Sequence, residues 1–378
     1  MRNMKFSALE FSGALGDMGT FLPLTVALAL VTGMDIGAIL IFAGLFNIVT
    51  GTLFGLPIPV QPMKAIAAVA IAEQLLPEQI AAAGLIVGAV VLLLGLTGLI
   101  EKIERLVPRS VIRGIQLGIG AKLALKGFEF IAGVPVFDLD SATTAATLGI
   151  AVLLLSHVRR FPAALALLGI GLALTFTMAP SGAIPVEPGF ARFSLIFPDM
   201  ASWKVGLFRG ALPQAPLTLL NSVLAVCALS GDLFPGKKVS TRRMAVSVGA
   251  MNLLSCWFGA MPMCHGSGGL AGQHFFGART GGSVVMLGAG KALVGALFGV
   301  TAMAVLGYFP HSILGVMLVF AGVELALPAR DQRDRRAFSV MALTAVGILA
   351  IDTATGFLIG LAASLVLLRI KPEPSDCD

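Results

Sequence analysis

The stretches LPIPVQPMKAIAAVAIAEQ (residues 56–74) and MPMCHGSGGLAGQHFFGARTGG (residues 261–282) decide the fold. Each opens on clustered prolines or glycines inside an otherwise apolar part of the chain. Proline removes a backbone donor and clashes with the preceding turn, and clustered glycine leaves the backbone loose. Each stretch is therefore predicted to begin extended and to continue as a half-helix that starts in mid-membrane. Non-helical backbone at that depth is tolerated only where it is buried in protein or lines a cavity.

The composition places the whole chain in a lipid bilayer. Of its 378 residues, 57% are hydrophobic and only 12% are charged, and the mean hydropathy is +0.94. A soluble protein carries roughly a quarter of charged residues, so a soluble enzyme is excluded. The net charge of +6 does not indicate nucleic acid, because the basic residues lie in short loops between apolar runs. The four cysteines lack CxxC spacing, so we expect no disulfide framework, metal or cofactor.

Apolar runs predict an all-α polytopic protein with fourteen transmembrane segments. They lie near residues 8–31, 36–56, 60–76, 80–100, 108–128, 142–157, 162–180, 210–231, 241–260, 264–278, 281–307, 310–327, 337–352 and 354–370. Most Lys and Arg residues fall in alternate loops, which predicts cytoplasmic N- and C-termini. The expected organisation is a first repeat over 1–180, an extracytoplasmic linker over 181–208, a second repeat over 209–371 and a short cytoplasmic tail over 372–378.

The two halves resemble each other. GLFNIVTGTLFGLP, which starts at Gly44, aligns with GAMNLLSCWFGAMP, which starts at Gly249, and the alignment matches Asn47 to Asn252. Because each half has an odd number of segments, the second must enter the membrane from the opposite side. This 7+7 inverted repeat is typical of alternating-access transporters. We expect the two asparagines to brace helices near the site.

Interrupted segments at matching places in two halves indicate a substrate site. A helix start presents unpaired N–H groups and about half a positive charge, which favours an anion. Lys64 lies in the first turn of one half-helix, and Ser267, Gly268 and Gly269 offer a hydroxyl and accessible amides at the other. The expected cargo is a small, compact anion.

Three stretches resemble the molybdate transporter family, which is related to the sulfate permease superfamily. PVQPMKAIAAVAIAE (59–73) and FGAMPMCHGSGGLAGQHFFGARTGGS (258–283) are similar to its two signature motifs, and FSGALGDMGTFLPL (11–24) is similar to its first span. The resemblance implies molybdate uptake by a core domain (segments one to four and eight to eleven) and a gate domain, with the substrate between segments three and ten. It also suggests a homodimer. We expect no C-terminal regulatory domain after Lys371, which would be a departure from typical sulfate permeases.

Several candidate site residues have more than one interpretation. We expect the substrate to contact Thr20, Gln61, Pro62, Met63, Lys64, Gln214, Asn221, His265, Gly266, Ser267, Gly268 and Gly269. Asp17 either pairs with Lys64, orients donors or takes a coupling proton, and a structural cap at the helix break is its alternative. His265 either donates to the oxyanion, titrates as a proton partner or packs. Gln214 and Asn221 lie seven residues apart, about two helical turns, and either bind the anion or join helices.

The leading hypothesis is a secondary transporter that imports molybdate, with tungstate or sulfate as further oxyanions, by alternating access in a bacterial inner or plasma membrane. Uptake of a dianion against an inside-negative potential needs a driving ion, for which we predict a proton, with Asp17 or His265 as the coupling group. The alternatives are a sulfate, bicarbonate or nucleobase carrier and an anion channel on the same fold. Residues 210–231 and 264–278 contain no Asp or Glu, which argues against nucleobases. An intramembrane enzyme built on His265 and Ser267 lacks a third catalytic group.

Overall fold

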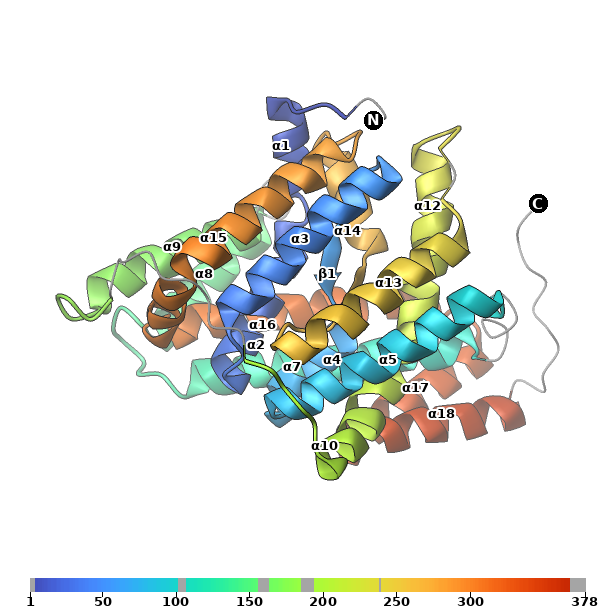
Figure 1. Cartoon of the computed structure of the whole chain (residues 1–378). Coiled ribbons are helices and arrows are strands. Elements are labelled where there is room, and N and C mark those ends of the chain that lie inside the picture. Colours follow the sequence, from blue (N-terminus) through green and yellow to red (C-terminus); the bar gives the residue numbers. More distant parts are fainter. Residues whose placement is uncertain (1–3, 101–106, 156–162, 185–193, 238, 368–378) are drawn as a thin grey trace.

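The computed structural model describes residues 4–100, 107–155, 163–184, 194–237 and 239–367. The predicted tail 372–378 and part of the predicted linker lie outside these residues. Figure 1 shows that the chain is built almost entirely of helices around one short pair of strands.

The elements follow one another along the chain in a regular order. The first part contains α1 (Ala8–Leu15), α2 (Met18–Thr32), α3 (Ile36–Phe54), β1 (Val60–Pro62), α4 (Lys64–Glu73), α5 (Pro77–Thr97), α7 (Arg109–Ala132), α8 (Ala142–Leu155) and α9 (Ala163–Met178). The second contains α10 (Met200–Val205), η1 (Gly206–Ala211), α11 (Leu212–Leu217), η2 (Thr218–Leu224), α12 (Ala225–Leu233), α13 (Thr241–Ser255), η3 (Cys256–Phe258), β2 (Met263–His265), α14 (Ser267–Phe275), α15 (Gly282–Gly307), α16 (His311–Ala326), η4 (Leu327–Asp331), α17 (Arg335–Ala350) and α18 (Thr353–Leu367).

Several of these helices are long and apolar enough to cross a bilayer. Among the described residues five helices pass this test, and a sixth span results if α1 and α2, which meet at a 48° bend, are counted as one. Three further apolar helices are shorter, including Ala142–Leu155 and Thr353–Leu367. The protein is therefore a mostly helical membrane protein, as the composition predicts.

The two interrupted segments begin as strands that pair with each other. β1 and β2 are antiparallel, and Gln61 lies opposite Cys264. The prediction of an extended stretch before each half-helix is confirmed. Each strand is also fixed by an asparagine from the preceding long helix: Asn47 Oδ1 accepts from the Val60 amide at 2.8 Å, and Asn252 Oδ1 accepts from the Met263 amide at 2.8 Å. The repeat-matched asparagines therefore satisfy backbone donors that have no water available in the membrane.

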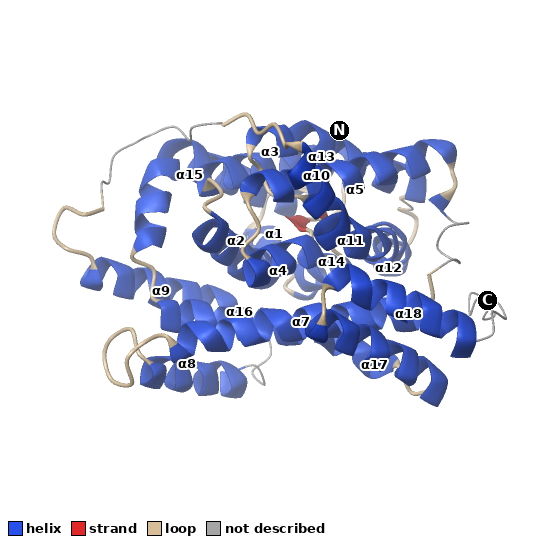
Figure 2. Cartoon of the chain, turned by 90° about the horizontal axis from the view of Figure 1, so that it is seen from below, coloured by secondary structure: helices blue, strands red, loops and turns tan. Residues whose placement is uncertain are grey.

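Close helix pairs surround the strands. α3 packs along α15, and α5 packs along α13 (Figure 1). A Cβ atom added at Gly288 of α15 would lie 2.5 Å from the Gly44 carbonyl oxygen of α3, so only glycine permits this approach. The contact fixes α15 and places Lys291 one turn beyond Gly288. In Figure 2, α7, α8, α16, α17 and α18 lie together on the other side of the molecule.

The helical segment that holds Gln214 starts earlier than the sequence predicts. It runs without interruption from Met200 to Leu233, whereas the sequence predicts a linker up to residue 208. The cause is Asp199, whose side chain caps the helix by accepting from the Ser202 amide at 2.8 Å. This hydrogen bond to the backbone lowers the pKa of the exposed Asp199 carboxyl below its usual value.

Candidate anion site

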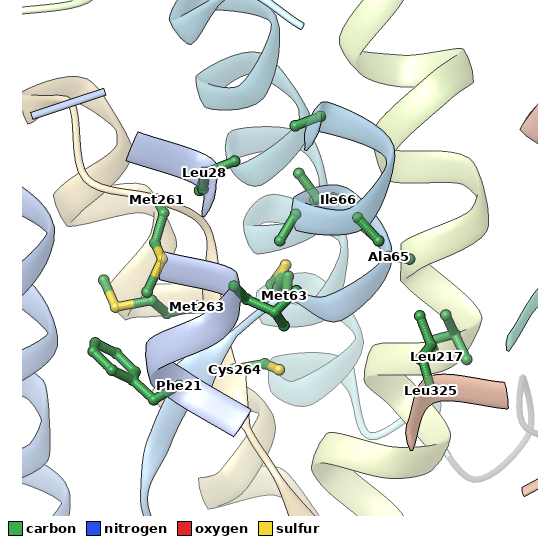
Figure 3. Packing of buried hydrophobic residues seen from close by; sticks show 14 of the residues in the cluster. Phe21, Leu28, Met63, Ala65, Ile66, Leu217, Met261, Met263, Cys264 and Leu325 are labelled. Carbon is green, nitrogen blue, oxygen red and sulfur yellow. The ribbon is translucent and has the colours of Figure 1, made fainter. Parts of the chain in front are cut away.

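The starts of the two half-helices lie at opposite ends of the β1–β2 pair. Met63 ends the extended stretch before α4, and Gly266 ends the one before α14. Figure 3 shows Met63 at the turn into α4, near Cys264, with Ala65 and Ile66 on the first helical turn. Because the strands are antiparallel and in register, the two helix starts belong to one compact unit. This arrangement agrees with the prediction that the broken segments meet.

Lys64 and Thr20 line a common cavity, as the sequence analysis expects of two substrate contacts. The cavity is small, and its other walls come from α2, α7 and α16, including Leu123, Glu324 and Leu325. Both Lys64 and Thr20 are half-buried. A lysine at a helix start in such a place adds a full positive charge to the helix dipole. Glu324, an exposed residue to which the sequence patterns assign no role, lines the same cavity.

The start of α14 offers unpaired backbone donors. Within the described part of the chain, the amides of Ser267, Gly268 and Gly269 have no acceptor, and the first bond of this helix runs from the Leu270 amide to the Gly266 carbonyl. Gly268 is exposed, and a Cβ atom added there would meet nothing within 4 Å. Three donors at a helix start next to open space can bind an oxyanion.

Gln214 occupies the start of the other half-helix. Its Oε1 accepts from the Ala65 amide at 2.8 Å and from the Ile66 amide at 3.2 Å, while its Nε2 donates to Thr218 Oγ1 at 2.9 Å. Gln214 is 2% exposed. The side chain therefore fills the place at α4 that an anion's oxygen would take, and it belongs to the wall of the site.

We expect Gln214→Glu to keep the fold and to weaken oxyanion binding about tenfold, which corresponds to ~1.4 kcal/mol. A carboxylate at the α4 start would hold the same amides with charge-assisted bonds, but it would repel an anion. The measurements are melting temperature and the dissociation constant for molybdate. Gln79→Glu is the matched control, because Gln79 Oε1 caps the Leu76 amide at the start of α5. Equal affinity in both variants would show that the α4 start does not face the anion.

Asn221 is not placed relative to Gln214 as the sequence predicts. The two-turn spacing assumes a regular α-helix, but residues 206–211 and 218–224 form π-helical turns. A π-turn contains more residues than an α-turn, so the angle between the two side chains changes. Asn221 is half-buried, whereas Gln214 is buried.

Gln61 and Asp17 form a buried pair behind the half-helices. Gln61 Nε2 donates to Asp17 Oδ1 at 2.5 Å, and the two side chains are 1% and 0% exposed. The nearest cation to Asp17 is Lys291 of α15, whose Nζ lies 3.8 Å from Asp17 Oδ2. The expected pairing of Asp17 with Lys64 is therefore wrong, because α15 brings a closer ammonium. The alternative of a helix cap is also wrong, since the Asp17 side chain accepts no capping bond from α2.

His265 points away from the open space. It is 0% exposed, with Nδ1 3.1 Å from the Pro59 carbonyl and Nε2 3.0 Å from Ser247 Oγ. Because the carbonyl only accepts, Nδ1 carries the proton and Nε2 accepts from the serine hydroxyl. Both ring nitrogens are engaged, so the structure supports the packing reading of His265 over contact with an anion.

The site thus has an exposed layer and a buried layer. The half-buried or exposed candidates are Thr20, Lys64, Asn221, Gly266, Ser267 and Gly268, and the buried candidates are Asp17, Gln61, Pro62, Met63, Gln214, His265 and Gly269. Sequence reasoning missed Lys291, although a lone lysine within an apolar run requires a partner, and Asp17 is the buried acid available in a neighbouring span. No group of three or more His, Cys, Asp or Glu residues that could hold a metal exists among the residues described.

Three solved structures share the fold of this chain. The chain matches SLC26A9 with a TM-score of 0.73 and 14% identity, covering 95% of this chain and 65% of that one. It matches the transmembrane domain of the cyanobacterial bicarbonate transporter BicA with a TM-score of 0.66 and 16% identity, covering 94% and 97%. It also matches murine Slc26a9, described as an anion transporter in the inward-facing state, with a TM-score of 0.73. At these identities the likeness shows the fold alone.

The sequence comparisons identify the family within that fold. The model of the family described as "Molybdate transporter of MFS superfamily" matches residues 9–123 and 206–325. "Molybdate transporter 2" of Arabidopsis thaliana is 41% identical over 97% of this chain and 88% of its own length. "Molybdate transporter 1" of the same plant is 37% identical over 96% and 90%, and the protein of that name from Chlamydomonas reinhardtii is 35% identical. The chain belongs to the molybdate transporter family, which is a family of transporters and not of enzymes.

Proposed function

We propose that this protein is a secondary active transporter that imports molybdate by alternating access. The observation that carries the proposal is the β1–β2 pair, which joins Lys64 at one helix start to the unpaired amides of Ser267, Gly268 and Gly269 at the other. A tetrahedral dianion offers four oxygens to these donors, and an ammonium and backbone amides supply charge-assisted hydrogen bonds. Membership of the molybdate transporter family supports molybdate as the particular oxyanion.

The proposed architecture has fourteen segments in a 7+7 inverted repeat. The first repeat covers 1–180, a linker begins at 181, and the second repeat extends to 371, with its first helical segment already beginning at Met200. Both termini are cytoplasmic. α1 to α5 and η1 to α15 form the core, and α7 to α9 with α16 to α18 form the gate. The equivalent roles of Asn47 and Asn252 support the repeat. Substrate is released when the core moves against the gate, and two copies form a homodimer in a bacterial inner or plasma membrane.

The proposed coupling ion is a proton, because each negative charge costs about 2.3 kcal/mol per 100 mV to bring into a negative interior. Asp17 is the better coupling candidate, since both ring nitrogens of His265 already have partners. The charged groups that act on Asp17 are Lys291 and Lys64. A proton on Asp17 adds one positive charge to the site, and thereby favours the bound anion.

The test is uptake of labelled molybdate into liposomes that contain the purified protein. We expect concentrative uptake that accelerates when the outside is made acidic and that collapses when a protonophore is added. Sulfate, tungstate and uracil are added as competitors in parallel samples, and uracil should not reduce the uptake of molybdate. Uptake that ignores an imposed pH gradient would exclude proton coupling, and unitary currents without accumulation would indicate an anion channel. Better competition by sulfate than by tungstate would make the protein a sulfate carrier.

A further inference from the structure

Lys291 is a buried cation in α15, away from both ends of that helix. It is 6% exposed, and its Nζ lies 3.4 Å from the centroid of the Phe21 ring and 3.8 Å from Asp17 Oδ2. No hydrogen-bond acceptor among the described residues reaches the Nζ atom. Burial of an ammonium costs free energy unless a nearby carboxylate and an aromatic ring compensate it, as Asp17 and Phe21 do here. A lysine kept in such a place is expected to have a function.

Its partner Asp17 lies against the first turn of α14. A Cβ atom added at Gly269 would be 2.6 Å from Asp17 Oδ1 and 2.6 Å from Gln61 Nε2. A carboxylate at this distance from a helix start satisfies the positive end of the dipole. It also repels any anion that approaches the same amides, because no water screens the two charges. An uncompensated Asp17 would therefore oppose binding at the site that α14 forms.

We propose that Lys291 is a positioning residue whose ammonium cancels the charge of Asp17, so that Lys64 and the α14 start retain a net attraction for a substrate anion. The proposal rests on the proposed function, because it concerns the affinity of that same site. With both charges present, the Asp17–Lys291 pair is neutral and does not oppose the positive charge of Lys64. Without Lys291, the negative charge of Asp17 opposes that of Lys64 at the same site.

The pair also orients Gln61. Asp17 Oδ1 accepts from Gln61 Nε2, which holds the carboxamide under Gly266 and Gly269. Asp17 Oδ2 faces Lys291 and accepts no hydrogen bond from the described residues. The two carboxylate oxygens of Asp17 thus have different partners: Oδ1 holds the Gln61 side chain of β1, and Oδ2 faces the ammonium of Lys291.

The experiment measures molybdate binding to the purified protein, to three variants of the pair and to one control variant. We expect Lys291→Met to weaken binding at least tenfold, because it leaves Asp17 uncompensated. Asp17→Asn should bind at least as tightly as the wild type, since it leaves Lys291 in surplus. The double variant Asp17→Asn/Lys291→Met should return to within about threefold of the wild type. Lys126→Met is the control and should have no effect, because Lys126 pairs with the exposed Glu129.

Rescue by the double variant separates charge compensation from packing. A double variant as weak as Lys291→Met, or unchanged binding in Lys291→Met, would overturn the proposal. If Lys291→Met does not fold, the double variant alone decides, since weak binding by it contradicts compensation. A wild type that binds no molybdate but does bind sulfate overturns the proposed cargo, and the same series is then measured with sulfate. If no oxyanion binds, the series is measured by melting temperature, and a double variant as unstable as Lys291→Met overturns the proposal.

Discussion

Replacement of Lys64 by alanine is expected to weaken molybdate binding by about ten- to a hundredfold. Lys64 is the cation that lines the cavity together with Thr20, and its charge adds to the dipole of α4. A hydrogen bond to a charged group contributes about 1.5–3 kcal/mol, and each ~1.4 kcal/mol corresponds to tenfold in affinity. Because Lys64 is half-buried and has no ion-pair partner within 4 Å among the described residues, its loss should not destabilise the fold.

The measurement is the molybdate dissociation constant of the purified variant, together with its melting temperature. Lys204→Ala serves as the control, since Lys204 is exposed at the end of the short helix α10. Lys64→Arg should recover part of the affinity, because it keeps the charge but not the shape. An unchanged dissociation constant in Lys64→Ala would move the site away from the α4 start.

Gly266→Ala should have the second large effect, on stability as well as on binding. A Cβ atom at this position would lie 1.6 Å from Gln61 Oε1. Gln61 would have to leave its place, which breaks its hydrogen bond to Asp17 and leaves a buried carboxylate with fewer partners. Overpacking of this kind costs about 1–3 kcal/mol, and an orphaned buried polar group adds to it. We expect a lower melting temperature and loss of molybdate binding.

Gly268→Ala is the matched control, two residues further into the same half-helix. An added Cβ atom there meets nothing within 4 Å, so the melting temperature should equal that of the wild type. Comparison of the two variants by thermal unfolding in detergent separates backbone crowding from a general effect of alanine in α14. Equal melting temperatures for both variants would mean that Gln61 does not lie under Gly266 in the native protein.

The sequence predicts the broken segments correctly because their cause is local. The prolines before Lys64 cannot continue a regular helix, and Pro262 with the glycines near Ser267 disfavours one before α14 begins. The bracing roles of Asn47 and Asn252 follow from a different local signal, the repeat-matched position of a polar side chain in two apolar helices. The asparagines then have to pair with the strand amides, because an unpaired backbone amide in hydrocarbon costs several kcal/mol.

The partners of the charged residues are not local, and sequence reasoning misassigned them. Asp17 meets Lys291 and not Lys64, because α3 and α15 approach through Gly44 and Gly288 and bring a distant lysine to the first span. His265 turns toward Ser247 of α13, and Gln214 fills the α4 start. Each of these contacts depends on which helix packs beside which, and a pattern within one segment carries no such information.

The sequence by itself determined that this chain lies in a membrane, that two segments break at proline and glycine, and that their helix starts suit an anion. These properties arise from composition and backbone chemistry within a few residues. The tertiary structure alone decided which polar side chains face open space and which support the wall. The physical reason is that a buried charge or amide needs a hydrogen-bond or ion-pair partner. That partner lies on whichever helix the packing of small residues brings close.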